Sequence, residues 1–246
     1  EAASGGGPIL LILDEAQKVR GWSETLKFLW DNRPTTPELR VLILGSSSLL
    51  MQEGLTESLA GRFFLHRCSH WGYPECRDAF GWNLEQWIYF GGYPGAVTFT
   101  EDESSWKRYI ADSLIETVLA RDVLQMSKIA KPVLLRHLFA LAATLPAQCV
   151  SYTKMLGQLH DAGNTTTLAH YLDLLKGSGL LGGLQKYAGQ QVRSRGSSPK
   201  FQVHNNALLT SQQELTLEQA RQNPEHWGRL TESAIGAHLV NWSRGS

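Results

Sequence analysis

The sequence predicts an α/β fold in its first part and a mainly helical remainder. Two apolar runs, residues 9–13 and 39–44, are each followed by polar residues and are separated by one helical segment. A strand–helix–strand unit of this length favours a parallel sheet. Beyond residue 80 the apolar residues recur mostly at helical spacing, and only two later runs are short enough to be strands.

The composition is that of a globular protein and argues against several classes of function. The 246 residues are 42% hydrophobic, which is enough for a core, and no apolar run approaches the length of a membrane span. The 23 basic and 23 acidic residues balance, so the overall positive charge of a typical nucleic-acid-binding protein is absent. The three cysteines have no CxxC spacing, which favours a reducing, cytoplasmic setting over disulfides or zinc.

The first apolar run, residues 9–13, leads directly into Asp14 and Glu15. A continuous run of this kind predicts a strand buried on both faces of a parallel sheet. The two carboxylates then lie at the carboxyl end of the strand, where open α/β sheets bind ligands. One could hold Mg²⁺ while the other orients or deprotonates a water, as nucleoside triphosphate hydrolysis requires. Equally, the pair could be the acidic first turn of a helix.

The next segment predicts a helix and a second strand. Ser23 is a candidate N-cap for a helix that ends before Pro34, and residues 39–44 form the second buried strand. Gly45 allows a tight turn after this strand, and Ser46 can place its hydroxyl beside the carboxylates of the neighbouring strand. Ordinary turn and N-cap chemistry explains the serines that follow Gly45 equally well.

A helix over residues 49–59 and a short third strand over residues 63–67 are expected to follow. Arg62 lies between them and is a candidate for sensing or clamping phosphate charge. A surface arginine that compensates the carboxyl end of a helix is the alternative, and the sequence alone favours it.

The middle of the chain predicts two helices. Residues 83–90 predict a short helix that stops at a sharp turn over residues 91–94, Gly-Gly-Tyr-Pro. Residues 104–126 predict a long helix. It has a buried stripe and a surface Arg121–Asp122 pair. The stripe consists of Trp106, Ile110, Leu114, Val118 and Leu119.

Three helices and two short strands follow, over residues 132–145, 151–159, 165–176, 180–184 and 201–203. This order is the outline of a winged helix-turn-helix. The apolar face of its first helix is expected to be Val133, Leu134, Leu138, Leu141 and Leu145. The third helix offers polar groups for DNA, from Asn164 to Thr167 and at His170. Basic residues are few: Lys176, Lys186, Arg193, Arg195 and Lys200. Contact with DNA and contact with a protein therefore both stay open.

Five motifs in order resemble a large prokaryotic group of AAA+-type P-loop ATPases that carry a C-terminal domain of unknown function. They are Leu11–Gln17, like a Walker B strand, Leu42–Ser48, like a sensor-1 strand, Leu59–Phe63, Phe90–Pro94 and Ala120–Val123. The resemblance implies a partial P-loop NTPase sheet, ATP and Mg²⁺. It implies Asp14 as the metal ligand, Glu15 as the catalytic carboxylate, Gly45 and Ser46 beside the nucleotide, and Arg62 as an accessory sensor.

The resemblance also implies a domain order. The ATPase core covers residues 1–75, a helical lid 76–131, the winged helix 132–210, and the start of a nuclease-like domain 211–246. Nuclease activity is not expected, because Glu232 alone cannot hold a catalytic metal and Asn205 stands where relatives often carry Asp.

One motif of the group does not occur in these 246 residues. The phosphate-binding sequence G-x-x-x-x-G-K-[ST] is absent, and the resemblance places it before Glu1. We therefore expect little or no ATP binding by this polypeptide, which we interpret as a fragment of a nucleotide switch coupled to a winged helix. The alternative is a winged-helix module for DNA or protein with a non-catalytic ATPase remnant.

Overall fold

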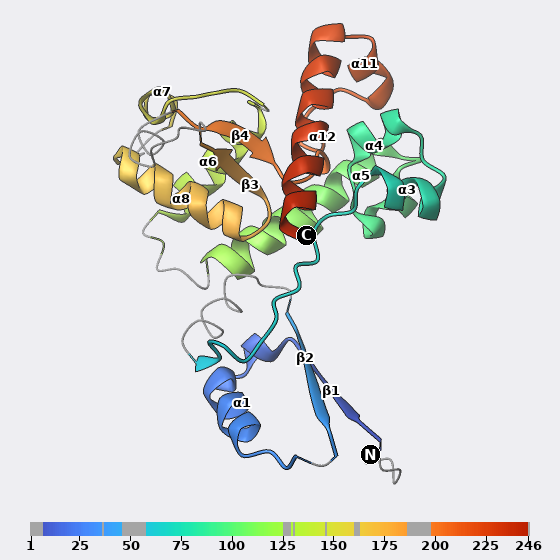
Figure 1. Ribbon diagram of the computed structural model, residues 1–246. Coiled ribbons are helices and arrows are strands. Elements are labelled where there is room, and N and C mark those ends of the chain that lie inside the picture. Colours follow the sequence, from blue (N-terminus) through green and yellow to red (C-terminus); the bar gives the residue numbers. More distant parts are fainter. Residues whose placement is uncertain are drawn as a thin grey trace. The chain divides into compact units, whose positions relative to one another are not determined.

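The computed structural model describes residues 7–35, 37–45, 58–124, 129, 131–145, 147–159, 163–185 and 198–245. The chain divides into two compact units, residues 1–65 and residues 66–246. Figure 1 labels most of the α-helices and the strands of both units. No helix in the described ranges is long and apolar enough to cross a membrane.

The first unit is a parallel strand pair joined through a helix, as the sequence predicted. Strand β1, Ile9–Asp14, pairs in parallel with strand β2, Leu39–Leu44, so that Ile9 lies opposite Leu39 and Asp14 opposite Leu44. The connection contains a short 3₁₀ turn, η1, and helix α1 (Figure 1), which span Ala16–Lys18 and Trp22–Asp31.

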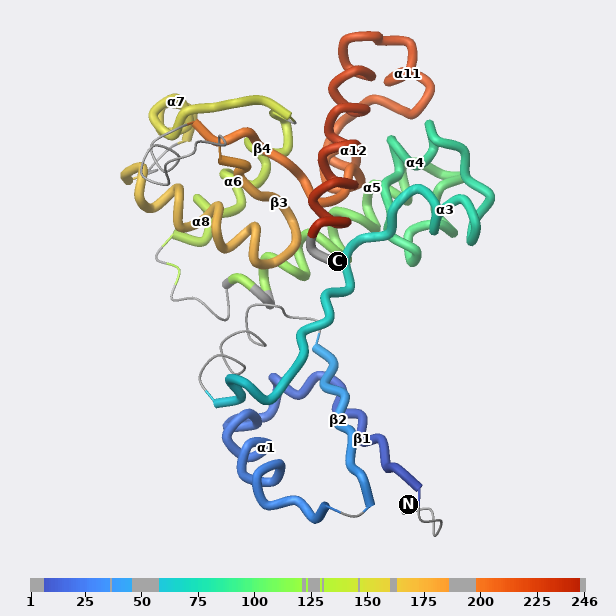
Figure 2. The backbone as a smooth tube through the Cα atoms, in the orientation of Figure 1, coloured from blue at the N-terminus to red at the C-terminus, as the bar shows by residue number. Residues whose placement is uncertain are grey.

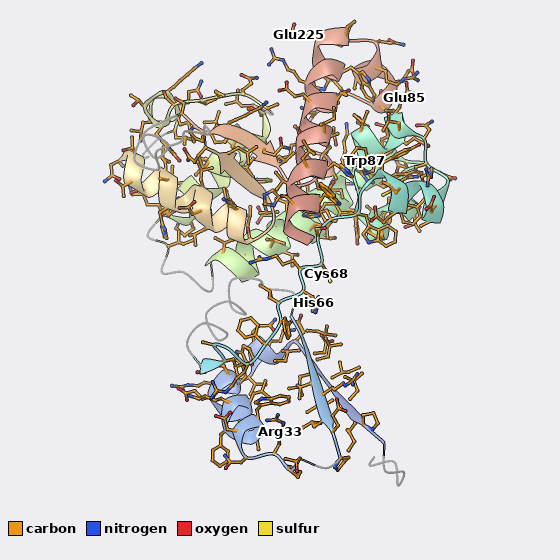
Figure 3. All side chains as sticks on the ribbon, in the orientation of Figure 1. Arg33, His66, Cys68, Glu85, Trp87 and Glu225 are labelled. Carbon is orange, nitrogen blue, oxygen red and sulfur yellow. The ribbon has the colours of Figure 1, made fainter. Side chains whose placement is uncertain are left out.

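Helix α1 begins earlier than expected, and a basic residue follows its carboxyl end. Its N-cap is Gly21, in the left-handed region at φ 70°, and not Ser23, because the Trp22 backbone already donates to the preceding turn. At the other end, Arg33 (Figure 3) donates to the Trp30 carbonyl at 2.6 Å and lies 3.6 Å over the Trp30 ring. A cation at this position stabilises the carbonyl end of a helix.

Two expectations for this unit are wrong. Strand β1 is not buried on both faces, since Ile9 to Ile12 are each 40–58% exposed. Two strands and one ten-residue helix supply too little apolar surface, within the described part of the unit, to cover both faces. Residues 63–67 form no strand, and Phe64 is 94% exposed. The helix expected over residues 49–59 lies mostly outside the described residues.

The second unit begins with a run of helices. Helix α4 confirms the expected helix over residues 83–90, and Asn83 caps it by accepting from the Gln86 backbone at 2.9 Å. Helix α5 is capped by Asp102 and continues without a break into two wide π-helical segments, η3 and η4. The elements are α3 Tyr73–Phe80, α4 Leu84–Phe90, η2 Pro94–Phe99, α5 Glu103–Arg108, η3 Tyr109–Ile115 and η4 Val118–Leu124.

The π-helical segments correct the predicted buried stripe. Trp106, Ile110 and Leu119 are buried as expected, but the other buried positions of the stripe are Ile115 and Val123. Each wide turn holds an extra residue, which moves the buried face one position along the sequence. The expected Leu114 and Val118 are accordingly only half-buried. The side chains of the predicted Arg121–Asp122 pair lie outside the described part of the structure.

Three helices and an antiparallel strand pair follow, in the predicted order. Strands β3 and β4 pair with Leu181 opposite Val203, and Cys149 forms an isolated bridge to Lys200. The elements are α6 Pro132–Ala143, α7 Tyr152–Leu156, α8 Thr165–Gly177, β3 Leu181–Leu184 and β4 Lys200–Val203.

The apolar face of α6 differs from the predicted one. Val133 is 63% exposed in the first turn, whereas Leu135 and Phe139 are buried beside the expected Leu134 and Leu138. The buried face of α6 is therefore centred one position further along the chain than the leucine spacing suggested.

Three more helices, α10 Ala207–Thr210, α11 Leu217–Arg221 and α12 Pro224–Gly245, complete the second unit. Figure 2 shows α12 between β4 and α4. Residues 201–210 are all buried, and hydrogen bonds join this segment to α4 and α12. Within them, the Asn206 amide donates to the carbonyls of Ile88 in α4 and Leu230 in α12, at 2.7 and 2.9 Å.

Candidate functional site

The carboxyl ends of β1 and β2 bring the first predicted residues to one edge of the strand pair. Asp14 ends β1 opposite Leu44, the last residue of β2, and Gly45 follows directly. Both Asp14 and Gly45 are exposed. This is the edge at which parallel sheets bind ligands. Ser46, the predicted γ-phosphate sensor, lies outside the described residues.

Glu15 has a backbone conformation that residues other than glycine rarely adopt. Its φ and ψ are 54° and 36°, in the left-handed region. Such a conformation costs a residue with a Cβ about 1–2 kcal/mol and is found disproportionately at functional sites. The carboxylate accepts from Gln17 Nε2 at 3.2 Å and lies 2.8 Å from Lys18 Nζ. The turn therefore holds Glu15 beside Asp14 with a defined orientation.

Arg62, the predicted charge sensor, is paired with Asp31 at the end of α1. Its Nε and one terminal nitrogen donate to the two Asp31 oxygens at 2.9 and 3.1 Å. This fork geometry is the strongest form of an arginine–carboxylate pair. It lowers the pKa of Asp31 and raises the pKa of Arg62, mainly through the side-chain hydrogen bonds. The structure thus places Arg62 on Asp31 and not on Asp14 or Glu15.

The residues at the sheet edge fit a magnesium ion whose remaining ligands are waters and phosphate oxygens. Within the described ranges, no cluster of three or more His, Cys, Asp or Glu side chains could hold a metal. Mg²⁺ in nucleotide sites is held by one or two carboxylates together with waters and substrate phosphates. The exposed carboxylate of Asp14 meets that requirement without further protein ligands.

Helix α8 carries the polar groups that were considered for DNA contact. Asn164 caps it by accepting from the Thr167 backbone at 2.9 Å, while Thr166 and His170 are exposed. Asp173 is exposed on the same helix and would repel a phosphate. Lys200 forms an ion pair with Glu232 of α12, so it is already engaged. Lys186, Arg193 and Arg195 lie outside the described residues.

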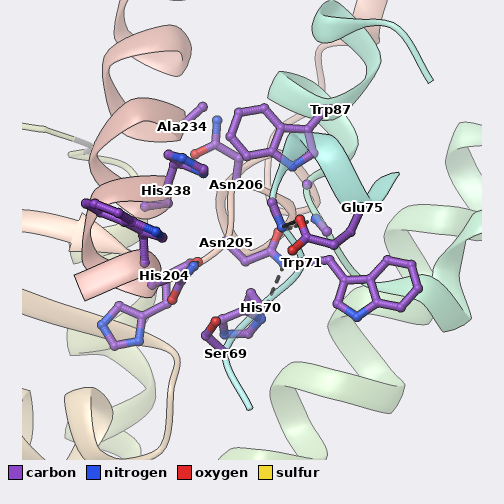
Figure 4. Close-up of a pocket in the computed structure, with 16 residues that line it drawn as sticks. Ser69, His70, Trp71, Glu75, Trp87, His204, Asn205, Asn206, Ala234 and His238 are labelled. Carbon is purple, nitrogen blue, oxygen red and sulfur yellow. Dashed lines mark hydrogen bonds between the residues drawn. The ribbon is translucent and has the colours of Figure 1, made fainter. Parts of the chain in front are cut away.

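Sequence reasoning missed a pocket within the second unit. Its walls come from segments far apart in the sequence, around residues 69–75, 87–92, 204–206 and 234–242 (Figure 4). No local spacing could reveal it, because the chain brings these segments together only through the core. The Gly-Gly-Tyr-Pro turn, which the resemblance assigned to a nucleotide lid, forms part of this pocket.

A hydrogen-bonded chain through His70 and Asn205 supports one side of the pocket. Asn205 Oδ1 accepts from the backbones of Gly92 and Ala207, each at 3.1 Å, so its amide nitrogen faces His70 Nδ1 at 3.4 Å. The other ring nitrogen of His70 lies 3.1 Å from the Gly179 carbonyl and must donate to it. These contacts hold the His70 ring between Asn205 and the Gly179 carbonyl.

Comparison with known families identifies two regions of the chain. Residues 2–75 match the model of an AAA domain, which makes the first part an AAA-type domain. Residues 81–219, more than half of the chain, match a family described as a domain of unknown function, DUF8612. No curated protein and no solved structure matches the chain. The chain therefore belongs to the DUF8612 family, with an AAA-type domain ahead of the family region.

Proposed function

We propose that the first unit contributes the metal and water side of an ATP-hydrolysing site, and that this site acts as a nucleotide switch for a winged helix in the second unit. The observation that carries the proposal is the position of Asp14 and Glu15. They lie at the carboxyl edge of a parallel strand pair, inside the region that matches an AAA domain.

Each residue has a distinct role in this proposal. Asp14 holds the metal, and Glu15 accepts a proton from, or orients, the attacking water. Gly45 lets the backbone turn away after β2, and Ser46 senses the γ-phosphate. When bound, Mg²⁺ neutralises the negative charge that develops on the phosphate oxygens.

The Arg62–Asp31 pair sets the condition under which Arg62 can take part. Asp31 engages two of the five N–H groups of Arg62 and the Ala60 carbonyl a third, so Arg62 can meet a phosphate through its remaining N–H groups or by exchange with Asp31. The proposal therefore assigns Arg62 an accessory role that begins only when nucleotide is bound.

Binding of a fluorescent ATP analogue tests this proposal. We expect weak or no binding to the 246-residue polypeptide and micromolar binding to a form extended upstream of Glu1 through the phosphate-binding loop. Absence of binding by the extended form would remove the proposal. Micromolar binding by the shorter form would show that the loop is not the main phosphate contact.

A second candidate function rests on the order of α6, α7 and α8 followed by the β3–β4 hairpin. This order supports a winged-helix module that contacts DNA or a protein. The polar, exposed Thr166 and His170 on α8 favour contact through that helix. Electrophoretic mobility of a DNA duplex at rising salt separates the two partners. DNA binding must weaken steeply with salt, and its absence leaves the protein partner.

A further inference from the structure

The turn between β1 and α1 contains two features that lower stability, one at Glu15 and one at Gln17. Glu15 has a left-handed backbone, at φ 54° and ψ 36°. The side-chain oxygen of Gln17 is buried and has no hydrogen-bond partner in the part of the chain that the structure describes. Backbone strain and unpaired buried polar atoms are found disproportionately where a site depends on them. This turn is therefore a candidate for a role beyond joining β1 to α1.

The side chains of the turn meet at one atom, Glu15 Oε2. Gln17 Nε2 donates to this oxygen at 3.2 Å, and Lys18 Nζ lies 2.8 Å from it. The 3₁₀ turn η1 produces this arrangement, because the Lys18 backbone N–H donates to the Glu15 carbonyl at 3.0 Å. Residues three apart in a 3₁₀ turn lie above one another, so the side chain of Lys18 returns to Glu15.

The Glu15 carboxylate determines which way the Gln17 amide points. In the opposite orientation the Gln17 oxygen would lie close to Glu15 Oε2, and two acceptors would face each other. The observed orientation avoids this repulsion and leaves the oxygen unpaired. Within the described ranges, the bond to Glu15 is the one hydrogen bond of the Gln17 side chain. The orientation of the amide is thus explained by Glu15 alone.

Of the two donors, Gln17 holds the carboxylate more firmly. The Lys18 side chain is 70% exposed, and exposed ion pairs contribute little because water and dissolved ions screen them. Gln17 is half-buried, and its hydrogen bond to Glu15 is partly shielded from water. Loss of the Gln17 donor should therefore release the Glu15 carboxylate more than loss of the Lys18 charge.

We propose that Gln17 is the positioning residue of Glu15. It acts through Oε2 and keeps the carboxylate in the orientation in which Glu15 meets the attacking water. This inference rests on the proposed function, since it deepens the role given there to Glu15. It has a consequence for stability as well. The unpaired oxygen of Gln17 lowers the stability of the first unit, while the contact with Glu15 raises the rate of hydrolysis.

Gln17→Met separates these two effects. Methionine has nearly the same length but provides neither the N–H donor nor the unpaired oxygen. In the form extended upstream of Glu1 through the phosphate-binding loop, we expect kcat for ATP hydrolysis to fall at least about tenfold, because a misplaced carboxylate loses its alignment. The Kd of the fluorescent ATP analogue should stay within about twofold, because the contact orients a catalytic group and does not bind ATP.

The melting temperature gives a second readout that needs no nucleotide. In the 246-residue polypeptide, Gln17→Met should leave the melting temperature of the first unit equal or higher, because it removes a buried unpaired oxygen. A purely structural role of Gln17 predicts the reverse, with a lower melting temperature and an unchanged kcat. That result would overturn the inference.

Two matched variants serve as controls. Gln158→Met makes the same change at an exposed glutamine of the second unit and should leave kcat and the Kd at the parent values. Lys18→Met removes the exposed ion pair and should lower kcat by less than about threefold. A loss in Lys18→Met as large as that in Gln17→Met would overturn the assignment to Gln17.

Glu15→Gln in the extended form distinguishes failure of this inference from failure of the proposed function. If the parent hydrolyses ATP and Glu15→Gln does not, the proposed function holds. A Gln17→Met protein with the parent kcat then overturns the inference alone. If the parent does not hydrolyse ATP, or if Glu15→Gln keeps the parent rate, the proposed function and the inference both fail.

Discussion

The backbone N–H of Gly92 donates to Asn205 Oδ1 at 3.1 Å, across 113 positions of the sequence. This hydrogen bond joins the turn after α4 to the segment after β4. It gives the Gly-Gly-Tyr-Pro turn a structural role, because a Cβ on Gly91 would overlap Asn205 Oδ1 and one on Gly92 would overlap the Trp71 carbonyl. Both glycines are therefore required by the close approach of other backbone and side-chain atoms.

Substitution of this contact is expected to destabilise the second unit strongly. Asn205→Ala leaves two buried backbone N–H groups unpaired, each worth about 1–3 kcal/mol of unfolding free energy. Gly92→Ala forces the turn off Trp71 and costs about 1–3 kcal/mol or more by overpacking. Urea unfolding followed by circular dichroism measures both.

Gly228→Ala is the control for the glycine substitution. Gly228 lies inside α12 with open space around it, so a Cβ there meets nothing. Alanine in a helix interior should stabilise the protein by up to about 1 kcal/mol. A Gly92→Ala protein as stable as the parent would contradict the tight contact with Trp71.

The three cysteines should differ sharply in reactivity. Cys76 is fully buried, and burial, together with the nearby Glu75 charge, raises its pKa to about 11. At a pH of about 8 its thiol stays protonated and inaccessible, whereas Cys68 and Cys149 are exposed. A chromogenic disulfide reagent should titrate two thiols in the folded protein and a third only after denaturation. The folded Cys76→Ser protein should still react at two thiols. Reaction at only one would mean that Cys76 is one of the reactive thiols, which would contradict this assignment.

Asp102 should make the stability of the second unit pH-dependent at acid pH. It caps α5 and accepts from Ser105 and Ser104, and these hydrogen bonds lower its pKa to about 2. A carboxyl whose pKa is lower in the folded state stabilises the protein above its ordinary pKa of about 3.9. The contribution is lost as the pH falls from there to about 2.

Asp102→Asn isolates this effect. Asparagine retains an oxygen that can cap the helix but does not titrate in this range. The difference in melting temperature between the two proteins should therefore shrink as the pH falls below about 4. A difference that stays constant down to a pH of about 2 would show that Asp102 does not titrate as described.

The conformation of Glu15 predicts different effects of two small substitutions. Glu15→Ala and Glu15→Gly both remove the contacts to Gln17 and Lys18, but only glycine adopts the left-handed region without strain. The glycine variant should therefore be more stable than the alanine variant by about 1 kcal/mol. Thermal unfolding of the two variants side by side decides this, and a more stable alanine variant would argue against the positive φ.

Much of the element order could be predicted from the sequence, because local signals fix it. The apolar runs of β1 and β2, the Asn83 cap and the helical spacing in α8 each act within a few residues. The phase of the stripe after Ile110 could not be predicted, because residues 114, 115, 118 and 119 are all apolar and the spacing fits both phases. Similarly, the pairing of Arg62 with Asp31 joins positions 31 residues apart, and only the folded chain brings them together.

The placement of the candidate residues was predictable to the same extent. Asp14 ends β1, and Glu15 and Gly45 directly follow β1 and β2, so parallel pairing was enough to bring them to one edge. The pocket of the second unit depends on four distant segments and on the Asn205 contact, and neither composition nor motif spacing could indicate it.

Phosphate release from ATP by the form extended through the phosphate-binding loop tests the central proposal most directly. Glu15→Gln should bind ATP but hydrolyse it at least about 100-fold more slowly, in the range expected for loss of a general base. Glu24→Gln, in the first turn of α1, changes a carboxylate near in sequence and should keep the parent rate. Hydrolysis by Glu15→Gln at the rate of the parent protein would contradict the assignment of Glu15 and, with it, the proposed site.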